Sequence, residues 1–237
     1  MDKNSNTYIF LYAVAMVVIV AAGLSLLATN LRPRQEFNEE VQKKQDILAA
    51  MHIKSTVENA ADIYDNRIKT SRVVNSEGEI LEDLDAFEVE LKKELDKPVE
   101  KRNLPMYIGE TDDGEEKIVI PLRGKGLWGP IWGYIALDDD YNTVYGASFA
   151  HQAETPGLGA EINTEEFESQ FNGKKILDDN GDFVSVDVVK GGVPEDAERA
   201  VDAISGGTIT SHGLRDMLET CIEPYMTYFN QIKSSEE

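Results

Sequence analysis

The N-terminal part of the chain carries its strongest hydrophobic pattern. Residues 8–28 are 21 consecutive uncharged positions, and most of them are apolar. A helix of that length spans about 30 Å at ~1.5 Å per residue, which matches the hydrocarbon core of a bilayer. A cleaved signal peptide has a shorter apolar core and a small-x-small cleavage site, which residues 26–30 do not offer. The pattern therefore predicts a retained membrane anchor.

Helical spacing of apolar residues recurs after the anchor. It predicts a juxtamembrane helix over residues 36–54, continued over 57–68, and a final helix from about His212. The apolar stripe of that final helix consists of Leu214, Met217, Leu218, Cys221 and Ile222. Pro224 either kinks it or starts a second piece. Shorter helices are predicted at 85–95, at 163–166 with a capping box from Asn163 to Glu166, and at 194–203 with a proline near its start.

Alternating and β-branched residues predict strands between these helices. The predicted strands are 71–74 and 79–81, joined by a turn at 76–78, and then 117–122, 134–137, 143–149 and 183–189. Residues 138–142 form a predicted turn. Because neighbouring strands are joined by hairpins, the expected fold is α+β, with a mostly antiparallel sheet flanked by helices. We divide the chain into an anchor (1–34), a juxtamembrane helical and hairpin region (35–100) and a binding domain (101–237).

Charge narrows the set of partners. The formal net charge is −21, although residues 1–34 carry +2 from Lys3, Arg32 and Arg34 against Asp2. The acidic remainder repels phosphate backbones, so nucleic acid is excluded as a partner. A phosphate group bound here must be held by local geometry or by a covalent bond. The few charges that flank the apolar stretch place the large domain in the cytoplasm by the positive-inside rule.

The segment from Ser205 to Thr210 crowds three hydroxyls and two glycines into six residues, directly before the last predicted helix. Glycines allow a tight turn with exposed N–H groups, and a helix start adds partial positive charge. The combination suits a phosphate, held as a ligand or as an ester on a hydroxyl. Ser-Gly-Gly-Thr is also typical of an ordinary surface turn, in which Thr210 only caps the helix.

Three blocks in one order resemble a known family. Residues 205–210, Ser-Gly-Gly-Thr-Ile-Thr, resemble the S-G-A-T-x-T motif at which FMN is joined covalently to the last Thr or Ser, with Gly207 in place of the usual Ala. Residues 151–159, ending Glu-Thr-Pro-Gly-Leu-Gly, and 126–133, Gly-Leu-Trp-Gly-Pro-Ile-Trp-Gly, are similar to further segments of that FMN-binding domain. With the anchor, they resemble the C subunit of the sodium-translocating NADH:quinone oxidoreductases.

The resemblance implies a phosphoester between FMN and Thr210, made by a separate magnesium-dependent flavin transferase that takes FMN from FAD. An isolated threonine hydroxyl is a poor nucleophile, so an activating enzyme is expected. Hydrogen-bonding groups near Thr210 are expected to hold the phosphate, namely Ser205, Gly206, Gly207, Thr208, Ser211 and His212. The residues that the resemblance implies near the ring are Leu127, Trp128, Glu154, Thr155, Gly157, Leu158 and Gly159. Lys190 is the nearby cation expected to stabilise negative charge on a reduced flavin.

Ordinary structural roles stay open for several of these residues. His212 is equally consistent with an exposed helix-start histidine, Lys190 with a turn lysine and Trp132 with core packing. Cys221 is the single cysteine, so no internal disulfide forms, and we expect it to pack as a small hydrophobe. No third ligand accompanies His151 and Glu154, so no metal site is expected.

The function implied is a one-electron relay by covalent FMN within a membrane complex that oxidises NADH, reduces quinone and exports sodium. Its partners are the other subunits, the membrane and, during maturation, the flavin transferase. The resemblance puts the domain on the periplasmic side of a bacterial inner membrane, against the charge rule. Two alternatives remain, namely the G subunit of the Rnf ferredoxin-linked complex and a flavin-free, membrane-tethered binding module.

Overall fold

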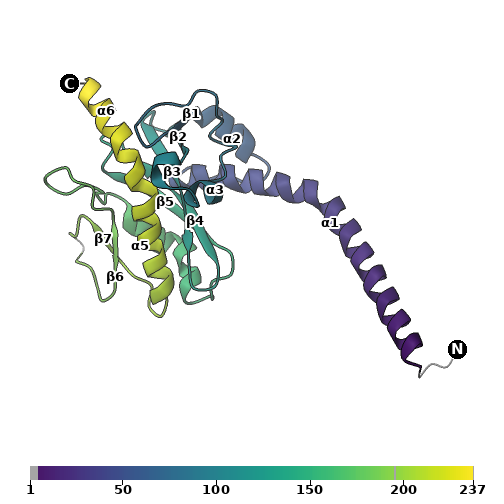
Figure 1. Cartoon of the computed structure of the whole chain (residues 1–237). Helices are drawn as coiled ribbons and strands as arrows, with labels where there is room; N and C mark the ends of the chain where they lie inside the picture. Colours follow the sequence, from purple (N-terminus) through teal and green to yellow (C-terminus); the bar gives the residue numbers. More distant parts are fainter. Residues whose placement is uncertain (1–4, 195, 237) are drawn as a thin grey trace. The chain divides into compact units, whose positions relative to one another are not determined.

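The computed structural model describes residues 5–194 and 196–236, and the chain divides into two compact units, Met1–Lys43 and Lys44–Glu237. Helix α1 (Asn6–Ala50) begins in the first unit and ends in the second, and it continues through Pro33. It therefore joins the predicted anchor and the predicted juxtamembrane helix in one element (Figure 1).

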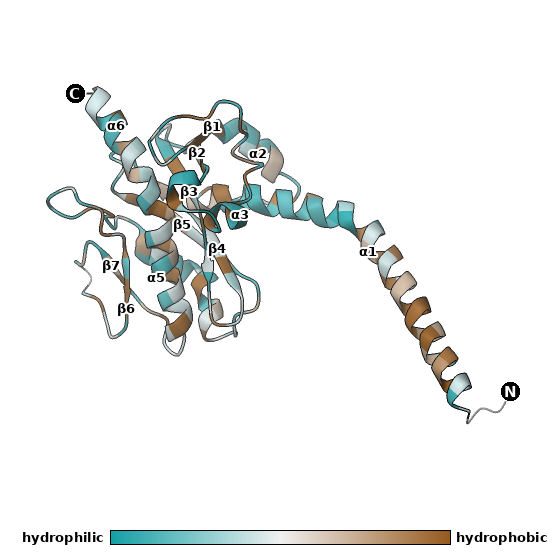
Figure 2. Cartoon of the chain, in the orientation of Figure 1, coloured by the Kyte–Doolittle hydropathy of each residue, from teal (hydrophilic) through white to brown (hydrophobic). Residues whose placement is uncertain are grey.

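The first unit contains the apolar part of α1. Its most apolar window has a mean hydropathy of 2.6, and the helix is long and apolar enough to cross a membrane (Figure 2). Large side chains such as Phe10 and Ile19 are exposed along it, 69% and 68% respectively, as expected for a surface that faces lipid. Of the charges used for the orientation argument, Asp2 and Lys3 lie outside the described residues. Arg32 is paired with Glu36 at 2.8 Å.

The second unit is built on a five-stranded antiparallel sheet whose strands follow one another in chain order. The strands are β1 (Ile68–Val74), β2 (Leu104–Glu110), β3 (Glu116–Lys125), β4 (Pro130–Leu137) and β5 (Val144–His151). The strands predicted at 71–74, 117–122, 134–137 and 143–149 are confirmed, and each is longer than predicted. The predicted hairpin is confirmed by an antiparallel bridge between Val74 and Ile80.

Both faces of the sheet are buried. Along β3, Ile118, Ile120 and Leu122 face one apolar cluster, whereas Val119 between them faces another. The first cluster includes the apolar stripe of α5 (Thr208–Ile222), and the second includes Ile47 at the end of α1. This alternation follows from the two-residue period of a strand. The α+β class with helices flanking an antiparallel sheet is confirmed.

Other short elements complete the unit. They are α2 (Ala60–Arg67), α3 (Leu91–Leu95), α4 (Glu165–Glu168) and α6 (Met226–Glu236), the 3₁₀ turns η1 (Val99–Lys101), η2 (Gly159–Asn163), η3 (Ser169–Phe171) and η4 (Glu223–Tyr225), and the strands β6 (Asp187–Val189) and β7 (Ala200–Asp202). Pro224 does start a second piece, through η4 and then α6. Cys221 is buried, and burial raises the pKa of its thiol to about 11, in keeping with a packing role.

Four predicted elements need correction. The helix predicted at 194–203 is wrong, because its backbone bonds to other segments: Asp187 N–H donates to the Arg199 carbonyl, and β7 pairs in parallel with β6. Only the last part of the strand predicted at 183–189 forms, as β6, and only the last part of the helix predicted at 85–95 forms, as α3. The cap of α4 is Thr164 rather than Asn163.

Candidate functional site

Helix α5 begins four residues earlier than predicted, so Thr210 lies inside its first turn. The N-cap is Gly207, without a side-chain cap, and Gly206 before it has a φ of +76° that favours glycine. Thr210 is 1% exposed and is therefore neither the cap nor a surface residue. The interpretation of Thr210 as an ordinary helix cap is wrong. The first turn of a helix leaves N–H groups without intrahelical partners, which suits a phosphate.

The Thr210 side chain contacts the block at residues 151–159, which ends Glu-Thr-Pro-Gly-Leu-Gly. Its Oγ1 donates a hydrogen bond to Oε2 of Glu154 at 2.5 Å, and Glu154 is only 5% exposed. The other carboxylate oxygen, Oε1, accepts from the Trp128 N–H at 2.8 Å. One buried carboxylate therefore connects all three blocks by hydrogen bonds, namely residues 126–133, 151–159 and 205–210.

Glycines make the room for this carboxylate. A Cβ at Gly126 would lie 2.5 Å from Oε1 of Glu154. A Cβ at Gly159 would overlap Oε2 and would lie 2.5 Å from Oγ1 of Thr210. Real Cβ atoms do not approach other atoms this closely, so an added side chain at either position would displace the carboxylate from the place it has here. The sequence predicted a role for Gly159 but did not single out Gly126.

The turn from Thr155 to Gly159 covers the start of the motif. A Cβ at Gly206 would lie 2.6 Å from Cδ2 of Leu158, so the leucine side chain rests on the Gly206 backbone. The Thr155 carbonyl accepts from the N–H groups of Leu158 and Ala160, both at 3.1 Å, which closes the turn. Gly157 has a φ of +76° and open space around it.

Large apolar side chains are exposed on the three segments that meet at this carboxylate. Leu127 is 49% exposed, Trp128 66%, Leu158 41% and Ile209 57%. Apolar side chains that gather unburied on one site mark a surface for a partner or a ligand. The sequence did not point to Ile209, because the central position of the motif carries no chemical group to single it out.

The other predicted phosphate neighbours differ in burial. Ser205, Gly206 and His212 are exposed, Thr208 is half-buried, and Ser211 is buried with its Oγ accepting from Ile204 N–H at 3.2 Å.

The remaining candidates are Lys190, Trp132 and His151. Lys190 is exposed and follows β6, whose last residue, Val189, accepts from the Ala203 N–H just before the motif. Trp132 is half-buried on β4. Nδ1 of His151 accepts from the Glu154 N–H at 3.2 Å, and no cluster of three metal-binding side chains occurs within residues 5–194 and 196–236.

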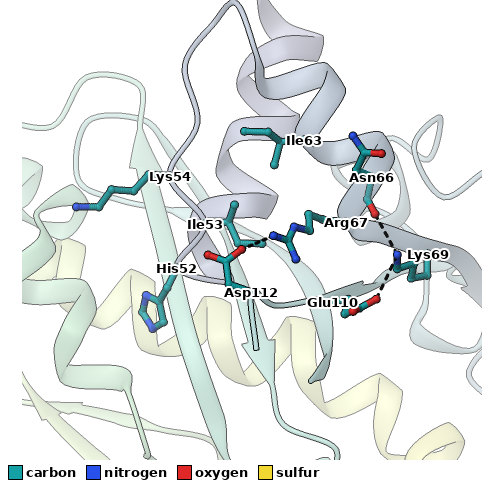
Figure 3. A pocket seen from close by; sticks show the side chains of 9 residues that line it. All are labelled: His52, Ile53, Lys54, Ile63, Asn66, Arg67, Lys69, Glu110 and Asp112. Atoms are coloured by element: carbon teal, nitrogen blue, oxygen red, sulfur yellow. Dashed lines mark hydrogen bonds and ion pairs between the residues drawn. The ribbon is translucent and has the colours of Figure 1, made fainter. Parts of the chain in front are cut away.

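A separate pocket of about 780 Å³ contains none of these residues. Figure 3 shows its lining side chains, which are His52, Ile53, Lys54, Ile63, Asn66, Arg67, Lys69, Glu110 and Asp112. Its cations are largely satisfied inside the pocket: Arg67 pairs with Asp112, and Lys69 pairs with Glu110 at 3.2 Å. The pocket is thus close to neutral and carries no signature of a flavin or nucleotide site.

Comparisons with known proteins agree with the motifs. The FMN-binding domain family matches residues 126–223. The C subunit of the Na(+)-translocating NADH-quinone reductase from Vibrio anguillarum is 32% identical over 216 residues, covering 85% of this chain and 84% of that protein. The crystal structure of the C subunit from Parabacteroides distasonis has a TM-score of 0.77 at 42% identity and covers 84% of this chain and 96% of that one. The crystal structure of Shewanella oneidensis NqrC has a TM-score of 0.71 at 28% identity, with coverages of 83% and 99%.

Proposed function

This chain belongs to the C-subunit family of the Na(+)-translocating NADH-quinone reductases, and from this membership we propose that it relays single electrons through FMN esterified to Thr210. The observation that carries the proposal is the convergence of three motif blocks on one hydroxyl, through Glu154. The relatives reported above are C subunits of these reductases, so the Rnf alternative has no support among them.

The residues of the site fit a phosphate-linked flavin. The helix start at Thr208 and the positive-φ Gly206 supply backbone N–H groups for the phosphate, which is attached next to them at Thr210. Because the Thr210 hydroxyl lies under Gly159, attachment requires the turn at 155–159 to move outward. Bound FMN would supply the one-electron chemistry.

The exposed apolar side chains give the ring a surface to lie on. Leu127, Trp128, Leu158 and Ile209 bury apolar area when a flat aromatic group covers them, and in doing so they exclude water from one side of the ring. Lys190, exposed after β6, is the proposed source of positive charge near the ring. The proposed electron partners are the other subunits of the reductase, reached from a domain that α1 tethers.

Location and coupling complete the proposed role. We propose an inner-membrane protein whose domain from Lys44 onward faces the periplasm, where free FMN is scarce and a covalent link prevents its loss. A flavin transferase is the proposed maturation enzyme, and sodium export is the proposed activity of the assembled complex. The division into an anchor (1–34), a juxtamembrane region (35–100) and an FMN-binding domain (101–237) stays a prediction.

In-gel fluorescence tests the attachment. The full chain is expressed with an active flavin transferase, denatured and separated by electrophoresis. We expect a fluorescent band for the wild type and for Thr208→Ala, and a dark band for Thr210→Ala. A dark wild-type band beside a labelled reference acceptor overturns the proposal and favours the flavin-free module.

A further inference from the structure

Thr210 has a buried hydrogen-bond partner, Glu154, which a threonine that only receives a modification does not need. A buried carboxylate and a buried hydroxyl, 56 residues apart in sequence, form a hydrogen bond of 2.5 Å. A surface acceptor for a modifying enzyme needs only an exposed hydroxyl. Here the fold gives that hydroxyl its own carboxylate partner.

The surroundings of Glu154 hold the carboxylate aimed at the hydroxyl. Its two oxygens accept from the Trp128 N–H and the Thr210 hydroxyl, so the two bonds fix the direction in which the carboxylate points. Within residues 5–194 and 196–236 no Lys or Arg forms an ion pair with it. A carboxylate without a cation partner is free to accept a proton, and Oε2 already receives the hydrogen bond of the proton that Thr210 must lose.

Resting on the proposed attachment at Thr210, we propose that Glu154 accepts the Thr210 proton while FMN is transferred from a flavin dinucleotide. The bond that forms joins Oγ1 of Thr210 to the phosphorus nearer the flavin. The bond that breaks is the phosphoanhydride, and the adenylate leaves with the bridging oxygen. The hydroxyl proton moves to Oε2 of Glu154, and no group is oxidised or reduced.

The same proton then removes a repulsion. After transfer, Oγ1 has no hydrogen and is joined to a charged phosphate, so an ionised Glu154 would face an acceptor and an anion in a buried site. A protonated Glu154 instead donates a hydrogen bond to the ester or phosphate oxygen. The carboxyl group is therefore expected to be neutral in the modified protein.

Glu154→Gln separates this role from packing. The amide has nearly the same shape, its oxygen can accept from Trp128 N–H, and its NH₂ can donate to Oγ1 of Thr210. The bond from Trp128 N–H is kept and the bond to Thr210 is kept with its direction reversed, while the ability to take the hydroxyl proton is lost. Removing a general base typically slows a step about 10² to 10⁴-fold.

The experiment measures the initial rate of flavin incorporation into the full-length chain, with purified transferase, FAD and Mg²⁺, from pH 5 to pH 9. We expect Glu154→Gln to be at least about 100-fold slower than the wild type, with an unchanged melting temperature. Glu154→Asp, which keeps the carboxylate on a shorter arm, should recover at least tenfold over Glu154→Gln.

Each other outcome has one meaning. Incorporation into Glu154→Gln at the wild-type rate, with the same pH profile, overturns the proton-acceptor role while leaving Thr210 as the attachment site. If Glu154→Gln does not melt cooperatively, Glu154→Ala, which removes the carboxylate and adds no bulk, decides, and incorporation at the wild-type rate overturns the role. A wild type that takes up no flavin, or a Thr210→Ala variant that does, refutes the proposed function instead.

Discussion

At the residue scale, Gly126 and Gly129 of one turn differ in the space that an added side chain would find. A Cβ at Gly126 would lie 2.5 Å from Oε1 of Glu154, whereas a Cβ at Gly129 would lie 3.5 Å from the Gln152 side chain, an ordinary contact. Neither glycine has a positive φ. The two positions therefore form a matched pair that separates the room needed by the carboxylate from general flexibility of the turn.

We expect Gly126→Ala to displace Glu154 and to lower flavin incorporation at least tenfold, while Gly129→Ala loads like the wild type. The physical reason is that the added methyl group at 126 occupies the position of a buried, hydrogen-bonded carboxylate oxygen, which must move. Quantitative in-gel fluorescence, normalised to protein stain, measures the difference. Equal loading of the two variants would show that the carboxylate position does not matter.

Glu168 is a second residue with a clear consequence. Burial raises the pKa of its carboxyl to about 7, and the charges of Asp46 and Glu165 raise this pKa further. The hydrogen bond that the carboxyl accepts from the Phe149 N–H at 2.6 Å acts in the opposite direction and lowers it. The folded protein therefore holds this proton more tightly than the unfolded chain. The resulting stability is fully present below pH 4.5, the ordinary value, and is lost as the pH rises through about 7.

Glu168→Gln should remove this pH dependence. Between pH 5 and pH 8 the free energy of unfolding of the wild type should fall by about 1 to 2 kcal/mol more than that of the variant, after allowance for the partial exposure of the side chain. Urea denaturation of a chain that begins at Lys44 measures it. A parallel decline of both proteins would refute the assignment.

The contact between Thr210 and Glu154 could not be predicted from the sequence. The motifs identified both residues, but their pairing depends on how β4, β5 and α5 fold together across 56 positions. Nothing in the local pattern of Glu-Thr-Pro-Gly-Leu-Gly distinguishes a buried glutamate from a solvated one. Gly126 was likewise quoted only as part of a block, since its role requires a neighbour from a distant segment.

At the scale of elements, α5 approaches β3 closely enough to exclude side chains from the contact. A Cβ at Gly213 would overlap the Lys125 carbonyl oxygen, and a Cβ at Gly124 would lie 2.7 Å from Cβ of Met217. These two glycines fix the distance between helix and strand. Since α5 carries Thr210 in its first turn, the same contact sets the height of the hydroxyl above Glu154.

Gly213→Ala should therefore destabilise the protein, although the same change in an exposed helix stabilises by about 1 kcal/mol. We expect a loss of about 2 kcal/mol or more in the free energy of unfolding, because helix and strand must separate. Thr220→Ala, at an exposed position of α5, serves as the control and should stay within about 0.5 kcal/mol. A stabilised Gly213→Ala would contradict the close packing.

Helices and strands could be predicted from the sequence where the local hydrophobic pattern was unambiguous. The strands at 117–149 were recognised because β-branched and aromatic residues run between clear turns, and the stripe of α5 was recognised by its spacing. The helix at 194–203 was wrong because local propensity favoured it, whereas its backbone groups bond to β6 and to Lys175 N–H. Partners from other segments cannot be read from a local window.

At the scale of the whole molecule, the two units have different surfaces. The apolar window of α1 has none of its residues buried, whereas the unit from Lys44 onward closes two apolar clusters of its own, one on each face of the sheet. The first unit thus requires an apolar solvent, and the second does not.

A chain that begins at Lys44 should accordingly remain in the supernatant after ultracentrifugation and should melt cooperatively. The full chain should sediment with membranes, resist extraction at alkaline pH and dissolve in detergent. A truncated protein that sediments with membranes would show that a second surface binds lipid, and a full chain released by alkali would show that α1 does not span.

The most direct test of the central claim is the mass of one peptide. Trypsin cleavage after Arg199 and Arg215 releases residues 200–215, which contain Ser205, Thr208, Thr210 and Ser211. In protein matured with a flavin transferase, we predict that this peptide is heavier by FMN minus one water, with fragment ions that assign the mass to Thr210. An unmodified peptide, or a mass assigned to Thr208 or to either serine, would contradict the account.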